Sequence, residues 1–169
     1  LNRQYRNLKQ GDLSVSEYAR RMKQLKYYLI VLDDYTHYSW SFPLRNKSDT
    51  SPTLQRFFSF VYTQFHVIIK AMQCDNGGEF INTTLRHFFS SNGIAYRFSC
   101  PHTSPQNGKA ERLIRTTNDI IRTLLQQATL PPPFWVEALH TATYLLNRHP
   151  SRAIHPNTPY FLLYDTHPT

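Results

Sequence analysis

The chain has 169 residues, a net charge of +8 and a sequence pI near 9.7. This length fits one domain with a short appendage and allows roughly 70% of the unfolded surface to be buried. Two cysteines, Cys74 and Cys100, exclude a disulfide framework and favour a reducing, intracellular compartment, nuclear or cytoplasmic rather than secreted. No apolar run reaches the roughly 18 residues that span a bilayer, so we expect no membrane partner.

The basic charge is concentrated at the start of the chain. Residues 1–27 carry seven basic and two acidic side chains, a net +5, whereas residues 28–169 carry twelve and nine, a net +3. Within the first segment, Ser14 and Glu17 form a capping-box pattern, and the apolar residues Leu13, Tyr18, Met22 and Leu25 follow at near-helical spacing. We therefore predict a basic amphipathic helix to about residue 26, followed by a separate domain over 28–169.

The domain opens with strands. Residues 27–33 are an apolar, β-branched run, residues 34–37 favour a turn, and residues 38–42 alternate large and small side chains, which together predict a hairpin. Further strands are expected over 66–74 and 94–98. Helical spacing predicts helices over 48–64, 80–91, 108–128 and 134–148, with a helical turn at 159–163. Strands flanked by helices indicate an α/β fold with a mixed sheet.

Two carboxylates stand where a site is expected. Asp75 ends the strand predicted over 66–74, and Glu111 falls in the first turn predicted for helix 108–128. Each has a structural alternative, because Asp-Asn-Gly favours turns and Glu complements a helix dipole. Taken together, they indicate catalytic carboxylates that bind Mg²⁺ or Mn²⁺, since two such ions can activate an oxygen nucleophile and stabilise the leaving oxygen in phosphodiester transfer.

Polar and basic residues surround Glu111 and suit phosphate binding. The alternative is an ordinary solvated helix face. The sequence shows no zinc-site spacing, no Ser-His-Asp arrangement and no glycine-rich phosphate loop. With the basic net charge, this pattern predicts nucleic acid as a partner. The predicted nucleic-acid-binding residues are Gln106, Asn107, Lys109, Arg112 and Arg115.

Residues 28–168 resemble the integrase catalytic core of plant copia-type retrotransposons. The matching segments are DDYTHYSW at 33–40, QCDNGGEF at 73–80, SCP at 99–101, SPQNGKAERLIR at 104–115, FWVEA at 134–138 and YLLNRHPS at 144–151. The resemblance implies a ribonuclease-H-like fold and, for intact relatives, Mg²⁺-dependent end processing and strand transfer of DNA. It also implies that Asp75 and Glu111 are the second and third catalytic carboxylates.

The sequence departs from this family at its start. The family's first catalytic Asp, on a strand upstream of the hairpin in a His-x-Asp-x-x-Gly-Pro context, has no counterpart here. Asp33 and Asp34 match a different family position, and either is a candidate substitute. Residues 1–27 instead resemble part of the gag protein of the same elements. The metal triad is therefore incomplete, and we expect weak or absent integration activity.

The missing first strand is central in the family's sheet. We expect one of three outcomes: the hairpin pairs directly with strand 66–74, which is the favoured one, residues before Tyr28 extend into the gap, or the domain is unstable alone. Three functions follow from the sequence: an integrase-core-like domain, a non-catalytic nucleic-acid-binding module, and a protein-interaction fragment. The last would form a homodimer or associate with an intact integrase.

Overall fold

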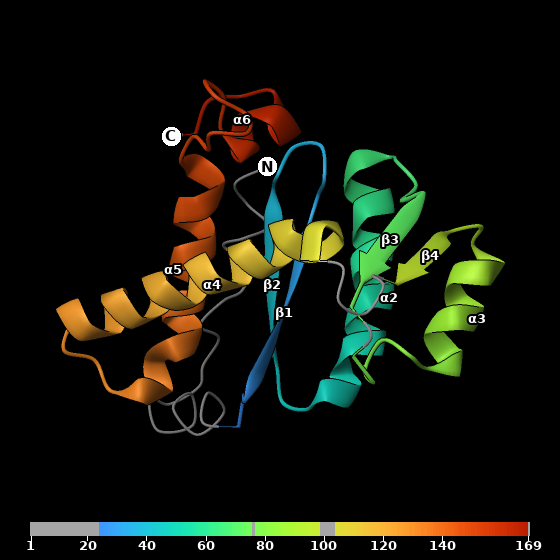
Figure 1. Cartoon of the computed structure of the whole chain (residues 1–169), viewed down its shortest axis with the longest axis horizontal. Coiled ribbons are helices and arrows are strands. Elements are labelled where there is room, and N and C mark those ends of the chain that lie inside the picture. Colours follow the sequence, from blue (N-terminus) through green and yellow to red (C-terminus); the bar gives the residue numbers. More distant parts are fainter. Residues whose placement is uncertain (1–23, 76, 99–103, 169) are drawn as a thin grey trace.

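The computed structural model describes residues 24–75, 77–98 and 104–168, and the side chains of 104–107 lie outside this description. The helix predicted before residue 26 falls mostly outside the described residues, and the described residues 24–26 are not helical. The elements are β1 (Tyr27–Leu32), β2 (Ser39–Leu44), η2 (Lys47–Asp49), α2 (Thr50–Phe65), β3 (Ala71–Cys74), α3 (Thr83–Ser91), β4 (Ala95–Phe98), α4 (Ser104–Gln127), η3 (Pro132–Phe134), α5 (Trp135–Arg148) and α6 (Pro159–Tyr164) (Figure 1).

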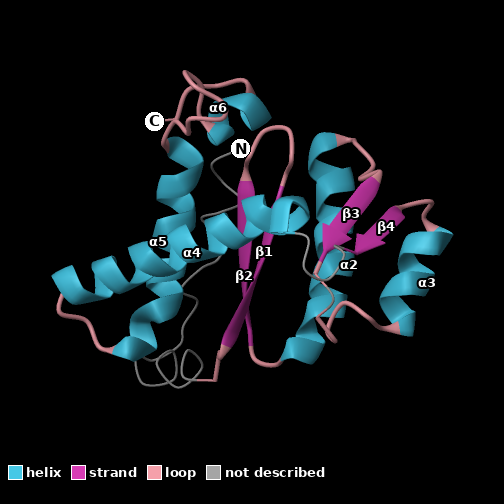
Figure 2. Ribbon diagram, in the orientation of Figure 1, coloured by secondary structure: helices cyan, strands magenta, loops and turns pink. Residues whose placement is uncertain are grey.

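The strands form two separate two-stranded sheets (Figure 2). β1 and β2 pair antiparallel, with Tyr27 opposite Leu44, whereas β3 and β4 pair parallel, with Ala71 opposite Ala95. The α/β class with both kinds of pairing is confirmed. The expectation that the hairpin pairs directly with strand 66–74 is wrong, since among the described residues no strand pairing joins the two sheets. The alternative that residues before Tyr28 enter the gap lies outside the described residues.

Helix α2 holds the two sheets together through side chains. One core cluster joins Leu29 of β1 and Leu44 of β2 to Leu54 and Phe57 of α2, and it extends to Phe89 of α3, next to β4. Apolar burial of this kind has no directional requirement, so it joins two sheets that share no hydrogen bonds. This packing accounts for the separate hairpin, which gains its burial from α2 without needing an edge contact to β3.

A second cluster lies on the opposite face of the hairpin. Ile121 of α4 and Leu139 of α5 are buried in it, and Tyr28 of β1 packs against them. Successive side chains of a strand point to opposite faces, so Tyr28 and Leu29 enter different clusters. The hairpin is therefore a layer between α2 on one side and α4 with α5 on the other.

Several predicted boundaries shift. The strand predicted over 66–74 is confined to Ala71–Cys74, because His66 ends α2 in a left-handed conformation (φ 54°) and no strand pairs with residues 67–69 in the described structure. The helix predicted from residue 80 begins at Thr83, since the Asn82 side chain accepts a 2.8 Å hydrogen bond from the Leu85 amide. The helix predicted over 108–128 begins earlier, at Ser104. The helical turn at α6 is confirmed.

Within the described ranges, no helix is long and apolar enough to cross a membrane.

Candidate nucleic-acid interface

Asp75 lies directly after β3, at the strand end that the sequence predicts. Its side chain is exposed, and its carboxylate accepts a 3.1 Å hydrogen bond from the Gly77 amide. This contact is the turn geometry that Asp favours, so the structural role weighed for Asp75 is present. Its other carboxylate oxygen accepts no hydrogen bond from the described residues.

Gly77 brings a second carboxylate into the same place. A Cβ at residue 77 would lie 3.0 Å from Asp75 Oδ1 and 3.0 Å from Glu79 Oε2. The missing side chain thus lets the two carboxylates approach one small space. Glu79 also pairs with Lys47 of η2 at 3.5 Å. Glu79 is not among the site residues predicted from the sequence, although it lies four residues from Asp75 across two glycines.

Glu111 lies on the solvent-exposed side of α4. Because α4 begins at Ser104, Glu111 is past the first two turns, and the prediction that it occupies the first turn is wrong. The helix-dipole alternative weakens accordingly, since that effect is confined to the first turn. Among the described residues, no three His, Cys, Asp or Glu side chains form a group that could hold a metal ion.

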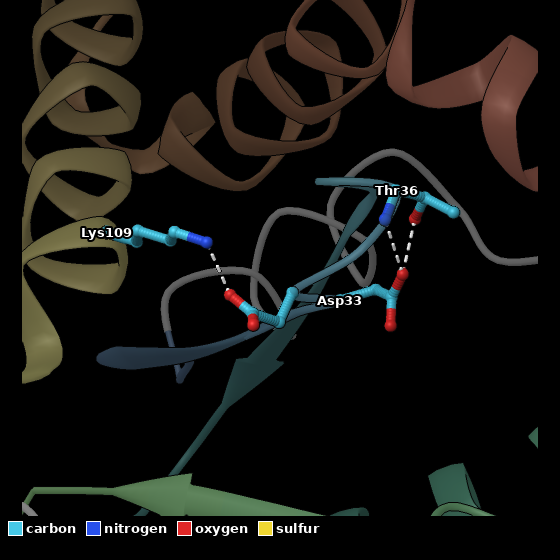
Figure 3. A network of polar contacts seen from close by, with 4 residues as sticks. Asp33, Thr36 and Lys109 are labelled. Atoms are coloured by element: carbon cyan, nitrogen blue, oxygen red, sulfur yellow. Dashed lines mark hydrogen bonds and ion pairs between the residues drawn. The ribbon is translucent and has the colours of Figure 1, made fainter. Parts of the chain in front are cut away.

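Lys109 of α4 reaches the turn between β1 and β2. Its ammonium donates a 2.6 Å hydrogen bond to Asp34 Oδ1 (Figure 3). The contact is solvated, with the two side chains 58% and 89% exposed. The hydrogen bond and the charge of Lys109 lower the pKa of the Asp34 carboxyl. The sequence analysis predicted Lys109 as a phosphate binder, and the structure gives it a carboxylate partner.

Asp33 is used inside the same turn. Its Oδ2 accepts hydrogen bonds from the Thr36 amide at 2.8 Å and from the Thr36 hydroxyl at 2.7 Å (Figure 3). Both candidate substitutes for the first catalytic Asp are thus already bonded to other side chains, Asp33 to Thr36 and Asp34 to Lys109. Asp33 stabilises the turn, and Asp34 joins the turn to α4.

The other predicted DNA-binding residues divide into two groups. Arg112 and Arg115 are exposed, lie one helical turn apart and have no acidic partner in the described part of the chain. The side chains of Gln106 and Asn107 lie outside the described residues. On α4 the apolar Ile114 is 42% exposed, whereas the polar Thr117 is buried. The exposed face of α4 is therefore wider than the sequence suggests.

A partly buried chain of polar contacts holds the segment that carries Asp75 and Glu79. Tyr96 of β4 donates a 2.7 Å hydrogen bond to the Phe80 carbonyl, and the Cys74 thiol lies 3.3 Å from the Tyr96 hydroxyl. Burial raises the pKa of the Cys74 thiol and that of Tyr96. Both groups therefore stay neutral at physiological pH, and the loop is fixed to β4 at its two ends.

Comparison with known proteins places this geometry in a family. The chain matches the family described as Integrase core domain over residues 6–104. It is 37% identical over 143 residues to the Retrovirus-related Pol polyprotein from transposon RE2 of Arabidopsis thaliana, covering 85% of this chain and 10% of that protein. It is 36% identical over 126 residues to the corresponding polyprotein from transposon TNT 1-94 of Nicotiana tabacum, covering 75% and 10%.

A solved structure supports the same fold. A chain in the cryo-EM structure of a simian T-cell lymphotropic virus intasome in complex with PP2A regulatory subunit B56 gamma superposes with a TM-score of 0.66 at 15% identity, covering 81% of this chain and 48% of that chain. The chain spans about one tenth of the length of the plant polyproteins it matches. The ribonuclease-H-like α/β fold is confirmed, and the chain belongs to the integrase core domain family of retrotransposon Pol polyproteins.

Proposed function

We propose that this domain binds DNA through the exposed face of α4 and has weak or no integration activity of its own. The observation that carries the proposal is the pairing of an integrase-core fold with an incomplete carboxylate set. Asp75 and Glu111 lie on two elements, and the described residues supply no group of three ligands around them. The division of the chain at residue 27 and the gag-like origin of 1–27 stay predictions.

The electrostatics favour DNA as the partner. The chain carries a net charge of +8, and Arg112 and Arg115 on one side of α4 have no acidic partner among the described residues. Contacts between such groups and phosphates release condensed counterions, so binding weakens steeply with salt. Gln106 and Asn107, which precede these arginines on α4, are proposed to add contacts to the DNA backbone.

A divalent cation fits the available donors only in part. Asp75 and Glu111 are the proposed metal ligands, and Glu79 shares the space beside Asp75. These oxygen donors suit Mg²⁺ or Mn²⁺. When bound, such an ion polarises phosphate oxygens and lowers the pKa of a coordinated water. Two ions need more carboxylate contacts than Asp75 and Glu111 provide, which supports the expectation of weak catalysis.

The proposal is tested with a labelled DNA duplex in Mg²⁺ and then in Mn²⁺. We expect the chain to retain the duplex in a binding assay but to nick and join it no faster than Asp75→Asn and Glu111→Gln do. Strand transfer that both substitutions abolish would overturn the expectation of weak activity and would direct attention to Asp33 and Asp34 as substitutes for the missing first carboxylate. Failure of the unmodified chain to retain DNA would overturn the binding proposal itself.

Self-association is the second candidate function, and the solved relative belongs to an assembly described as an intasome. We propose that this domain forms a homodimer or associates with an intact integrase in an intracellular compartment. Sedimentation at low and high salt distinguishes this candidate from the first, because association through apolar helix faces persists when DNA binding is lost.

A further inference from the structure

The hairpin has two outer edges, one along each strand, and the outer edge of β2 is protected from pairing with another strand. The Ser39 amide donates a 2.9 Å hydrogen bond to Asn147 Oδ1 of α5, and Asn147 Nδ2 donates a 2.8 Å bond back to the Ser39 carbonyl. Further along the same edge, Pro43 has no N–H to offer. A side chain and a proline thus block strand addition beside β2, as edge strands in native proteins commonly require.

The outer edge of β1 has no such protection in the described part of the chain. The Asp33 amide donates a 2.9 Å bond to the Tyr38 carbonyl, which marks Asp33 and Tyr38 as a hydrogen-bonded pair. Hydrogen-bonded and non-hydrogen-bonded pairs alternate along antiparallel strands. The backbone groups of Tyr28, Ile30 and Leu32 therefore point away from β2, and no backbone hydrogen bond among the described residues reaches them.

The second sheet presents a related surface. Ahead of β3, Val67 and Ile68 are 54% and 68% exposed, although both are apolar, β-branched residues that favour strands. Their neighbour Ile69 packs against the same core cluster as Val31 of β1. Each sheet has two strands, which is fewer than an independently stable sheet normally needs. An apolar strand beside β1 would therefore add a third strand to the hydrogen-bonded hairpin, and its side chains would enlarge the core cluster that packs on α2.

We propose that the outer edge of β1 accepts an extended strand from a second polypeptide by β-augmentation. The geometry selects a strand because Tyr28, Ile30 and Leu32 repeat with period two along one edge. It selects apolar, β-branched residues at alternate positions, because these would cover the side of the cluster to which Val31 and Ile69 contribute. The net charge of +8 favours a neutral or acidic strand over a second copy of this chain.

The test uses the full chain and a nine-residue peptide of alternating Val and Thr with Glu at each end. Amide hydrogen exchange is followed by NMR at Tyr28, Ile30 and Leu32. At a peptide concentration of about ten times Kd, these three amides are expected to slow about tenfold. Leu29 and Val31, whose amides already face β2, are expected to change little and act as internal controls. The same peptide N-methylated at every residue, which leaves neither edge with an N–H to donate, should have no effect.

Each remaining outcome overturns the proposal. Unchanged exchange at the three amides with saturating peptide would show that the edge does not accept a strand. Protection without peptide that rises with protein concentration would identify a second copy of the chain as the occupant. Protection without peptide that is independent of concentration would show that the chain covers its own edge. These results do not depend on DNA binding, so they separate this proposal from the proposed function.

Discussion

Lys109 and Asp34 form an ion pair across 75 residues of sequence, with Nζ 2.6 Å from Oδ1. The contact joins the hairpin turn to α4 two residues before Glu111 (Figure 3). Lys109 therefore has two competing partners in the proposed function, since the same ammonium that pairs with Asp34 is a candidate contact for phosphate. The competition makes specific predictions for binding and stability.

Removing the carboxylate should strengthen DNA binding. Asp34→Asn releases Lys109 to the DNA, so we expect tighter binding and a salt-dependence slope that is steeper by up to about 0.9. Fluorescence anisotropy with a labelled duplex over a range of salt concentrations measures both quantities. Asp165→Asn is the matched control, because it changes the net charge equally on an exposed tail residue whose left-handed conformation Asn tolerates. Equal effects of the two substitutions would indicate that the change in net charge alone, and not the release of Lys109, alters DNA binding.

The same ion pair makes a small, pH-dependent contribution to stability. Because Lys109 lowers the folded-state pKa of Asp34, the contribution is present above the ordinary carboxyl pKa, about 3.9, and is lost as pH falls through the lowered value. Both side chains are largely solvated, so the coupling energy should be at most about 1 kcal/mol. A double-mutant cycle of Lys109→Ala and Asp34→Ala in urea at pH 7 and pH 3 measures it. A coupling that grows on acidification would contradict this account.

Gly77 is predicted to matter for metal binding more than for folding. A Cβ at residue 77 would meet the Asp75 and Glu79 carboxylates at 3.0 Å, and these flexible side chains can move apart at little cost. We expect Gly77→Ala to change the free energy of unfolding by about 0.5 kcal/mol or less and to weaken Mn²⁺ binding about tenfold. Gly78→Ala is the control, since nothing lies within 4 Å of its added Cβ. Equal Mn²⁺ affinities in titrations followed by electron paramagnetic resonance would exclude the Asp75–Glu79 space as a metal site.

Asn147 is predicted to be the polar residue on which the docking of α5 depends most. Asn147→Ala leaves the Ser39 amide and carbonyl buried without partners, at a cost of about 1–3 kcal/mol each. Urea denaturation should show that loss. Thr141→Ala on the exposed side of α5 is the control, because its hydroxyl contacts only the Glu137 carbonyl in the same helix. A loss no larger than that of the control would mean that water replaces the amide.

The class of fold and most helices could be predicted from the sequence because their signals are local. The apolar spacing at Leu54, Phe57 and Phe58 marks the buried face of α2, and all three are buried. Pro159 similarly marks the first turn of α6. The strand predicted over 66–74 is too long. Val67 and Ile68 have the apolar, β-branched character of strand residues, but in the described structure no neighbouring strand pairs with them, and the sequence does not signal this.

Tertiary partners account for the rest. Nothing in the spacing of Lys109 or Asn147 predicts a contact to residues 75 or 108 positions away. The positions of Asp75 and Glu111 on a strand end and a helix were predictable from turn residues and periodicity. The convergence of Asp75 and Glu79 beside Gly77 depends on the loop geometry that Tyr96 fixes, which has no sequence signal of its own.

The salt dependence of DNA binding tests the central claim most directly. Arg112→Ala/Arg115→Ala should weaken binding to a labelled duplex and reduce the slope of log K against log salt by about 1.8, because two phosphate contacts are removed. The control is Arg45→Ala/Arg152→Ala, which removes the same charge from exposed sites outside α4. We predict a clearly smaller change for the control pair. Identical slopes and affinities for the two variants would show that α4 is not the DNA-binding face.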